Sequence, residues 1–287
     1  MRRDVTARLR YLLKLSRPRF WFYLAGPVVV GVAFGADSVP ELFLAANVLL
    51  FGYFLIPANL FLYGVNDVFD RDIDEANPKK EEREVRYDGG PLVPVVVVAS
   101  LLLGAGTFAL TPRTAWPFLA GFFLLGAGYS APPLRLKTTP LLDSVSNGLY
   151  VLPGAAAFAL LTGDAPPAAA LAGAWLWSMG MHTFSAIPDI GPDREAGIRT
   201  TATVLGEERG YAYCAGCWLS SAVAFAVVDN RIGLLLLAYP VVVFAVYWSG
   251  VAVDRAYWWY PAINTVVGAL LTMGALTRIV PPEAVLP

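Results

Sequence analysis

The sequence predicts an all-α membrane protein, a polytopic bundle of nine transmembrane helices. Of its 287 residues, 57% are hydrophobic and only 15% are charged, and its mean hydropathy of +0.57 lies outside the range of soluble globular proteins. Apolar runs of about 20 residues, the length that crosses a bilayer as a helix, recur along the whole chain. The runs are continuously apolar rather than alternating, which argues against a transmembrane barrel and leaves a helical bundle.

Short polar breaks separate the nine apolar runs. Each run is close to the length that the hydrocarbon core requires, and each ends where Pro, Gly or charged residues interrupt it. In chain order, the predicted helices occupy residues 20–36, 42–66, 92–111, 116–131, 143–162, 167–188, 209–228, 232–252 and 260–279. We expect a single domain over residues 1–287, with polar loops at about 67–91, 132–142 and 189–208.

The basic residues predict how the bundle is oriented. With a cytoplasmic N-terminus, 18 of the 21 Lys and Arg residues lie on the cytoplasmic side, and only Arg113, Arg231 and Arg278 lie elsewhere. This bias of positive charge sets the topology of most membrane proteins. The basic N-terminal segment has no convincing small-residue cleavage site, so we interpret it as a retained lead-in to the first helix. The prediction is a multi-pass protein of the cell membrane.

Acidic side chains mark the end of the second predicted helix. In the stretch "YGVNDVFDRDIDEANPKK", Asn66, Asp70 and Asp74 follow one another at intervals of four, and Asp67 precedes Asp70 by three. On a helix, this spacing places the four side chains on one face. Carboxylates crowded in this way repel one another and are costly to place near a bilayer, so a cation must compensate them.

A second acidic pair, Asp189 and Asp193, follows the sixth predicted helix with the same four-residue spacing. Because the two clusters are four helices apart, they suggest a duplicated four-helix unit plus one helix, with both clusters at one cavity mouth. Oxygen ligands favour hard cations, and Mg²⁺ commonly combines one or two carboxylates with substrate phosphates. We therefore predict Mg²⁺ and a polyphosphate here. The plain alternative is that both loops are merely solvated.

Cationic side chains in the neighbouring loops fit the same ligand. Arg135 and Lys137 follow the fourth helix, and Arg194 and Arg199 follow the sixth; all four can donate hydrogen bonds to phosphate oxygens. No P-loop or G-x-G-x-x-G motif occurs, so a nucleotide is not the expected ligand. The net charge of −1 is uninformative about nucleic acid, but no basic strip with interleaved aromatic residues lies outside the predicted membrane segments, so we do not expect nucleic-acid binding.

These residues resemble motifs of the UbiA-type intramembrane prenyltransferases. The first cluster is similar to the family's N-D-x-x-D-x-x-x-D motif, the second to its D-x-x-x-D, and "YSAPPLRLK" to the loop between its helices 4 and 5. The resemblance covers nearly the whole chain and implies a central cavity that opens to the cytoplasm. It also implies two Mg²⁺ ions that bridge an isoprenoid diphosphate to the acids. The residues concerned are Asn66, Asp67, Asp70, Asp74, Asp189 and Asp193 for the metal, and Tyr129, Arg135, Lys137, Arg194 and Arg199 for the diphosphate.

In such an enzyme, the diphosphate leaves with its electron pair, and an electrophilic allylic cation remains in a site that must exclude water. Asp70 and Asp193 are the expected catalytic acids. Aromatic faces are suited to stabilising the cation. The aromatic residues near the predicted mouth are Tyr63, Phe69, Tyr129, Tyr150 and Phe184.

Within the family, "SRPRFWFYLAGPVVVG" and "GMHTFSAIPDIGPDREAGIRTTATVLG" look most like the lycopene elongases of haloarchaea. The resemblance implies transfer of a dimethylallyl unit from its diphosphate to lycopene, on the way to bacterioruberin, and hydration of the product. No Lys or Arg lies between Phe20 and Asp70, which favours an apolar acceptor such as a carotenoid. The alternatives are a UbiA-type enzyme for a quinone precursor or an archaeal ether lipid and, more remotely, a transporter, whose site would usually lie at the bilayer midplane.

Three further polar residues are candidates for handling water. His182, the only histidine, precedes Asp189 by seven residues, two helical turns along the same face, and could orient water or act as a base. Asp143 and Asn147, four residues apart at the start of the fifth helix, are also candidates. The alternative for each is structural, namely a packed histidine, a helix cap or an interhelical hydrogen bond.

Overall fold

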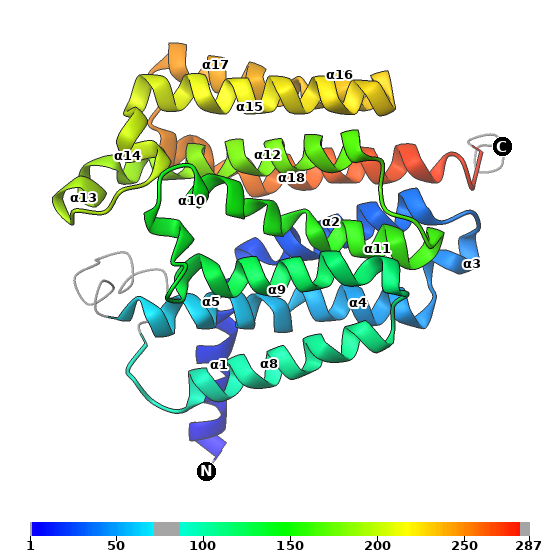
Figure 1. Ribbon diagram of the computed structural model, residues 1–287, viewed down its shortest axis with the longest axis horizontal. Coiled ribbons are helices and arrows are strands. Elements are labelled where there is room, and N and C mark those ends of the chain that lie inside the picture. The colour runs from blue at the N-terminus through cyan, green and yellow to red at the C-terminus, as the bar shows by residue number, and fades with distance from the viewer. Residues whose placement is uncertain (1, 72–86, 282–287) are drawn as a thin grey trace.

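The structure is a computed structural model that describes residues 2–71 and 87–281, and helices are the only regular secondary structure in these ranges (Figure 1). The α-helices are α1 (Arg2–Leu15), α2 (Trp21–Gly35), α3 (Val39–Leu42), α4 (Ala45–Leu55), α5 (Pro57–Phe69), α8 (Leu92–Ala109), α9 (Trp116–Ser130), α10 (Leu142–Val145), α11 (Leu152–Thr162), α12 (Ala168–Ala186), α13 (Ile190–Glu195), α14 (Thr201–Leu205), α15 (Glu207–Val228), α16 (Asn230–Leu236), α17 (Ala238–Ser249) and α18 (Val253–Leu276). The all-α prediction is confirmed.

Helices cover all nine predicted apolar segments, but three of the segments are interrupted. The second consists of α4 and α5, the fifth passes through the 3-10 segment η4 (Ser146–Tyr150) before α11, and the eighth consists of α16 and α17. Pro57 accounts for the first break, because a proline has no N–H to donate to the preceding turn and is best accommodated in the first turn of a helix.

Six helical stretches in the described residues are long and apolar enough to cross a membrane. They are Val39–Phe69, Leu92–Ala109, Leu142–Thr162, Glu207–Val228, Asn230–Ser249 and Val253–Leu276. The chain is therefore a multi-pass membrane protein, and its predicted nine crossings and its orientation stay predictions.

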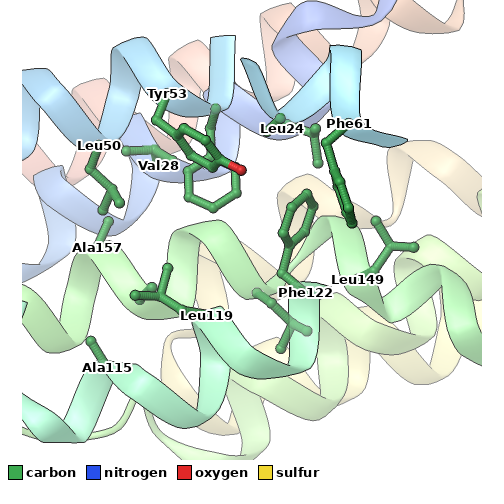
Figure 2. Close-up of a cluster of buried hydrophobic side chains, with 14 of the residues drawn as sticks. Leu24, Val28, Leu50, Tyr53, Phe61, Ala115, Leu119, Phe122, Leu149 and Ala157 are labelled. Atoms are coloured by element: carbon green, nitrogen blue, oxygen red, sulfur yellow. The ribbon is translucent and has the colours of Figure 1, made fainter. Parts of the chain in front are cut away.

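Buried side chains gather in two cores. The first lies between α2, α4, α5, α9 and α11, and its fully packed members run from Leu24 to Ala159 (Figure 2). At its centre, the Phe122 ring meets Phe54 edge-on at 5.1 Å and Phe61 at 6.2 Å between centroids. Such offset and edge-on arrangements are the favoured ones for aromatic pairs.

The second core is built mainly from α12, α15, α16, α17 and α18, and its buried members run from Met181 to Val267. Trp218 stacks on Tyr260 at 5.9 Å and lies 5.6 Å from Tyr239. Figure 1 shows the corresponding layers, with α15 to α17 covering α12 and α18. The first core is thus formed mainly by the N-terminal half of the chain, and the second core mainly by the C-terminal half.

Helices α2 and α11 approach so closely that only glycine fits at the crossing. A Cβ atom on Gly31 would lie 2.1 Å from the carbonyl oxygen of Gly154, and one on Gly154 would lie 2.6 Å from that of Pro27. Small residues are the usual means of close helix packing in membranes.

Figure 1 places the parts that carry the predicted site at one end of the bundle. The C-terminal end of α5, the loop that leads to α10, and the short helices α13 and α14 all lie at the left end of that view. The sequence segments with acidic and basic motifs therefore share one end of the molecule.

Candidate active site

Two buried carboxylates mark the end of α5. Asp67 is 2% exposed, and Asp70, the residue just after the last turn, is 5% exposed. The side-chain amide of Asn66 donates to the hydroxyl of Ser130 at 2.9 Å, which joins α5 to the end of α9. Buried carboxylates need charge partners or hydrogen bonds, so their surroundings identify what this end of α5 is built to hold.

Three cationic side chains surround the two carboxylates. Lys137 Nζ pairs with Asp70 Oδ2, and Arg135 Nη2 lies 3.4 Å from Asp70 Oδ1. Arg17 Nη2 lies 3.8 Å from Asp67 Oδ1. The structure therefore brings Arg135 and Lys137 to the first acidic cluster, as the phosphate hypothesis requires. It adds Arg17, which sequence reasoning missed and whose only signal was its place in the basic segment before the first helix.

The backbone is strained at two of these cations. Arg17 has φ 48° and Arg135 has φ 39°, in the left-handed region that residues other than glycine seldom adopt. Strain of this kind persists only where surrounding contacts hold it, and it concentrates at functional sites. Arg135 Nε is buried without an acceptor among the described residues. An unpaired buried donor is costly, and an incoming oxyanion would satisfy it.

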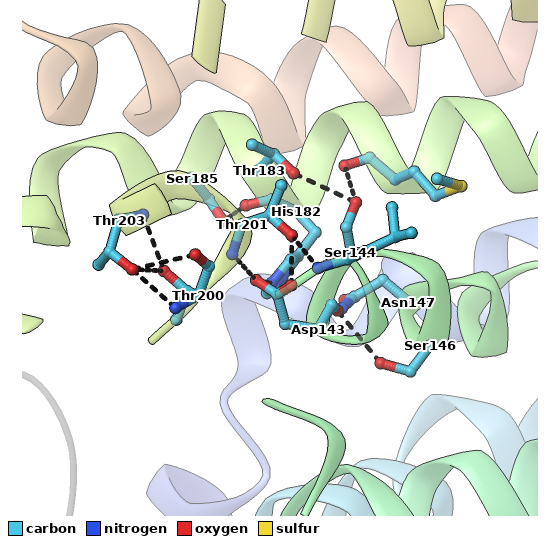
Figure 3. Close-up of polar contacts among 12 residues, drawn as sticks. Asp143, Ser144, Ser146, Asn147, His182, Thr183, Ser185, Thr200, Thr201 and Thr203 are labelled. Carbon is cyan, nitrogen blue, oxygen red and sulfur yellow. Dashed lines mark hydrogen bonds and ion pairs between the residues drawn. The ribbon is translucent and has the colours of Figure 1, made fainter. Parts of the chain in front are cut away.

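The loop that carries Arg135 also contacts the segment after the second acidic pair, through Thr201. The Leu141 N–H donates to Thr201 Oγ1 at 2.8 Å. Thr201 in turn donates its own N–H to Asp143 Oδ2 at 2.9 Å and its hydroxyl to Asp143 Oδ1 (Figure 3). Thr201 is a second residue that sequence reasoning missed. Its local signal is the Thr-rich start of α14, where Thr200 and Thr203 form a capping box.

The three candidates for handling water lie together around Asp143, which is 1% exposed. His182 Nε2 lies 3.5 Å from Asp143 Oδ2, and the Asn147 amide donates to the Asp143 backbone carbonyl at 2.7 Å. The ring of Tyr129 stands edge-on to that of His182, with centroids 6.1 Å apart. Tyr129 therefore lies beside the Asp143–His182 pair, and its contact with diphosphate stays a prediction.

The second acidic pair occupies a short helical turn. Asp189 ends the 3-10 segment η5 (Ile187–Asp189), Asp193 lies in α13, and both are partly exposed. Arg194 Nε and Nη2 both donate to the carbonyl of Thr203, at 3.2 and 2.7 Å, so this side chain joins α13 to α14. Its contact with phosphate stays a prediction, as does that of the exposed Arg199.

The acids do not form one metal-binding group within the described residues. In residues 2–71 and 87–281, no three Asp, Glu, His or Cys side chains lie close enough together to hold a metal ion. Asp74, the fourth member of the first predicted cluster, lies outside the described residues. The shared mouth of the two clusters therefore stays a prediction.

The first cluster nevertheless fits Mg²⁺ by its chemistry. Asp67 and Asp70 are two buried carboxylates three residues apart, with cations beside them and a buried guanidinium N–H that lacks an acceptor. Mg²⁺ typically takes one or two protein carboxylates and completes its octahedron with water and phosphate oxygens. A third protein ligand is not required for that arrangement.

The chain is similar to known proteins both in sequence and in fold. The model of the UbiA prenyltransferase family matches residues 24–275. A lycopene elongase/hydratase of Haloferax volcanii is 69% identical over 95% of this chain and 91% of its own length, and one of Halobacterium salinarum is 65% identical over 94% and 98%. A UbiA homolog from Archaeoglobus fulgidus, solved with DMAPP and Mg²⁺, superimposes with a TM-score of 0.76 at 24% identity, over 94% of this chain and 99% of its own.

Proposed function

Because the chain belongs to the UbiA prenyltransferase family, we propose that it transfers a dimethylallyl unit from dimethylallyl diphosphate to an end of lycopene and hydrates the product. Identity of 65–69% to two lycopene elongase/hydratases over nearly their full length supports this acceptor. The absence of Lys and Arg between Phe20 and Asp70 supports it independently, because an acidic acceptor would need a cationic partner.

The proposed enzyme crosses the membrane nine times, with its N-terminus and the mouth of its site in the cytoplasm. The helical state of all nine apolar segments supports the crossings, and the distribution of Lys and Arg supports the orientation. Both acidic segments lie at the same end of the bundle, as a single mouth demands (Figure 1).

Asp67 and Asp70 are the proposed Mg²⁺ ligands from α5, with Asn66 and Asp74 beside them and Asp189 and Asp193 completing the site from the second cluster. When bound, Mg²⁺ would supply the positive charge that neutralises the leaving diphosphate. The observation that carries this assignment is the buried Asp70 carboxylate held by Lys137 and Arg135, with Arg135 Nε still lacking an acceptor.

The chain's own residues have three tasks in the transfer. Arg135 and Lys137 donate to diphosphate oxygens, which holds the donor at the end of α5 and favours loss of the leaving group. Tyr63, which is buried, and Tyr150, which is half-buried, present aromatic rings suited to the allylic cation. The apolar helices around them keep bulk water out. Phe184 packs fully buried in the second core against Trp218 and Tyr260, so we assign it to packing instead.

The direct test is product analysis. Membranes that contain the protein, given lycopene and dimethylallyl diphosphate, should release diphosphate and yield carotenoids with one and two added five-carbon units, some of them hydroxylated. Mass spectrometry resolves these products. Product formation only with an aromatic acid or with a glycerol ether phosphate would overturn the assignment of lycopene as the acceptor. Movement of lycopene without release of diphosphate would indicate a transporter.

A further inference from the structure

A polar cluster lies apart from the carboxylates of α5, where α10, α12 and α14 meet (Figure 3). Its centre is the Asp143 carboxylate, which is almost completely buried. In the described residues, its only basic partner is His182, whose side chain keeps 15% of its surface exposed. The cluster thus pairs a buried carboxylate with an imidazole that is partly exposed.

The Asp143 carboxylate cannot rotate freely. Both of its oxygens accept hydrogen bonds from Thr201, and its backbone carbonyl accepts from Ser146 at 3.1 Å and from Asn147 at 2.7 Å. A buried carboxylate that is held in this way determines the orientation of the imidazole ring that faces it. With the Nε2–H of His182 directed at Asp143, Nδ1 is the ring nitrogen that keeps a lone pair.

Tyr129 connects this pair to the donor site. Its ring lies edge-on to that of His182, with centroids 6.1 Å apart. Tyr129 precedes Ser130, which ends α9 and accepts a hydrogen bond from Asn66 of the first acidic cluster. The imidazole therefore lies beside the ring of Tyr129. An acceptor whose reacting end reaches this ring would lie within reach of the imidazole.

We propose that His182, oriented by Asp143, accepts the proton of the water that quenches the elongated carotenoid cation, and so decides between an alcohol and an alkene. This inference rests on the proposed function. The terminal alkene of the acceptor attacks the allylic carbon, the carbon–oxygen bond to diphosphate breaks with its electron pair on oxygen, and a tertiary cation remains on the acceptor. Water oxygen then bonds to that carbon, and one of its protons passes to Nδ1.

Asp143 stabilises the resulting imidazolium through its opposite charge, as a carboxylate does for a histidine base in other enzymes. Without a base beside the water, the cation loses a neighbouring C–H proton instead and an alkene forms. His182 is the catalytic residue of this step. Asp143 and Thr201 are positioning residues that act through it.

The test uses the full-length protein in membranes, with lycopene, dimethylallyl diphosphate and ¹⁸O-labelled water. We expect the wild-type protein to give elongated alcohol carrying one ¹⁸O. His182→Gln and His182→Phe should lower the alcohol-to-alkene ratio by at least about tenfold, the lower end of what a positioned acid or base contributes, while total elongated product stays within about threefold.

Thr201 provides the positioning test. Thr201→Val removes the hydroxyl that donates to Asp143 and should lower the same ratio, and Thr201→Ser should restore it. Thr265→Val is the matched control, because the Thr265 hydroxyl donates only to Pro261 of its own helix.

Each outcome decides the proposal. No elongated product from the wild type would refute the proposed function itself. Elongation without ¹⁸O-labelled alcohol in the wild type, or an unchanged ratio in the His182 variants, would overturn the inference and leave transfer standing. Loss of all elongation in both His182 variants, although these proteins insert and stay monodisperse, would also overturn the inference. His182 and Asp143 would then be needed for the transfer itself.

Discussion

The guanidinium of Arg17 lies 3.8 Å from the carboxylate of Asp67 and 4.4 Å from the centroid of the Tyr63 ring. Arg17 precedes the first apolar segment, whereas Asp67 and Tyr63 belong to α5. The contact therefore makes the basic N-terminal segment part of the candidate site rather than a topological marker alone.

We expect Arg17→Gln to lower the stability of the protein in detergent by roughly 1–3 kcal/mol. The buried Asp67 carboxylate loses a positive neighbour, but the cost stays below that of stranding a fully buried charge because Arg17 is partly exposed. Added Mg²⁺ should recover more stability in the variant than in the wild type, since a bound cation would replace the missing charge. Thermal unfolding with and without Mg²⁺ measures both effects. Arg231→Gln, at an exposed position, is the control, and an equal Mg²⁺ shift in all three proteins would contradict the role given to Arg17.

Asp70→Asn and Asp193→Asn should each reduce transfer by at least about a hundredfold, because each removes charge that the leaving diphosphate depends on through Mg²⁺. Both variants should still insert into membranes. Diphosphate release from dimethylallyl diphosphate is the measurement. Asp164→Asn, in an exposed turn remote from these acids in sequence, should behave as the wild type. Normal rates in both active-site variants would remove the basis of the metal assignment.

Arg135→Lys separates charge from geometry. The lysine keeps a positive charge beside Asp70 but loses the planar guanidinium and the buried Nε donor. We expect KM for dimethylallyl diphosphate to rise about tenfold, with thermal stability unchanged. Steady-state kinetics across donor concentrations gives the answer. A change in kcat alone would assign Arg135 to a later step than donor binding.

Removal of divalent cations with EDTA should stop turnover, and Mg²⁺ should restore it. The predicted ligands are all oxygen atoms, which favours hard cations over zinc or copper. Diphosphate release during a Mg²⁺ titration is the measurement. Full activity after exhaustive chelation would show that Arg17, Arg135 and Lys137 suffice to neutralise the leaving group.

Gly31→Ala should destabilise the bundle by about 1–3 kcal/mol, the usual cost of forcing a methyl group into a packed interface. A Cβ there would meet the Gly154 carbonyl at 2.1 Å. Gly52→Ala is the matched control, because nothing lies within 4 Å of a Cβ built on Gly52. Unfolding temperatures of the two variants should differ clearly, and equal values would show that α2 and α11 separate at little cost.

The sequence was informative wherever one physical property dominates. Continuous hydrophobicity determines where a chain can cross a bilayer, so most apolar segments were predicted to within a few residues. The exception is the last segment, because α18 begins at Val253 and not at residue 260. Carboxylates beside an apolar run are so unfavourable that Asp67 and Asp70 predict a cation-binding region by themselves. Asp70 pairs with Arg135 and Lys137 in the structure, and the contact of these two residues with diphosphate stays a prediction.

Features that depend on contacts between distant segments could not be predicted. Thr201 is one of many threonines, and only the path of the chain places its hydroxyl between Leu141 and Asp143. Arg17 looked like one basic residue among several in the N-terminal segment. The broken start of α11 was not predicted either, although η4 places Ser146, Asn147 and Gly148 in an otherwise apolar segment.

The division of the interior into two cores bears on how the protein is made. Every fully buried member of the first core precedes residue 160, and every one of the second follows residue 180. During synthesis, the leading half can consolidate while the trailing half is still in the ribosome. His182 and Thr201 belong to the late half and Asp143 to the early one. The polar junction between them can therefore form only after Thr201 has left the ribosome, and it is incomplete in any shorter nascent chain.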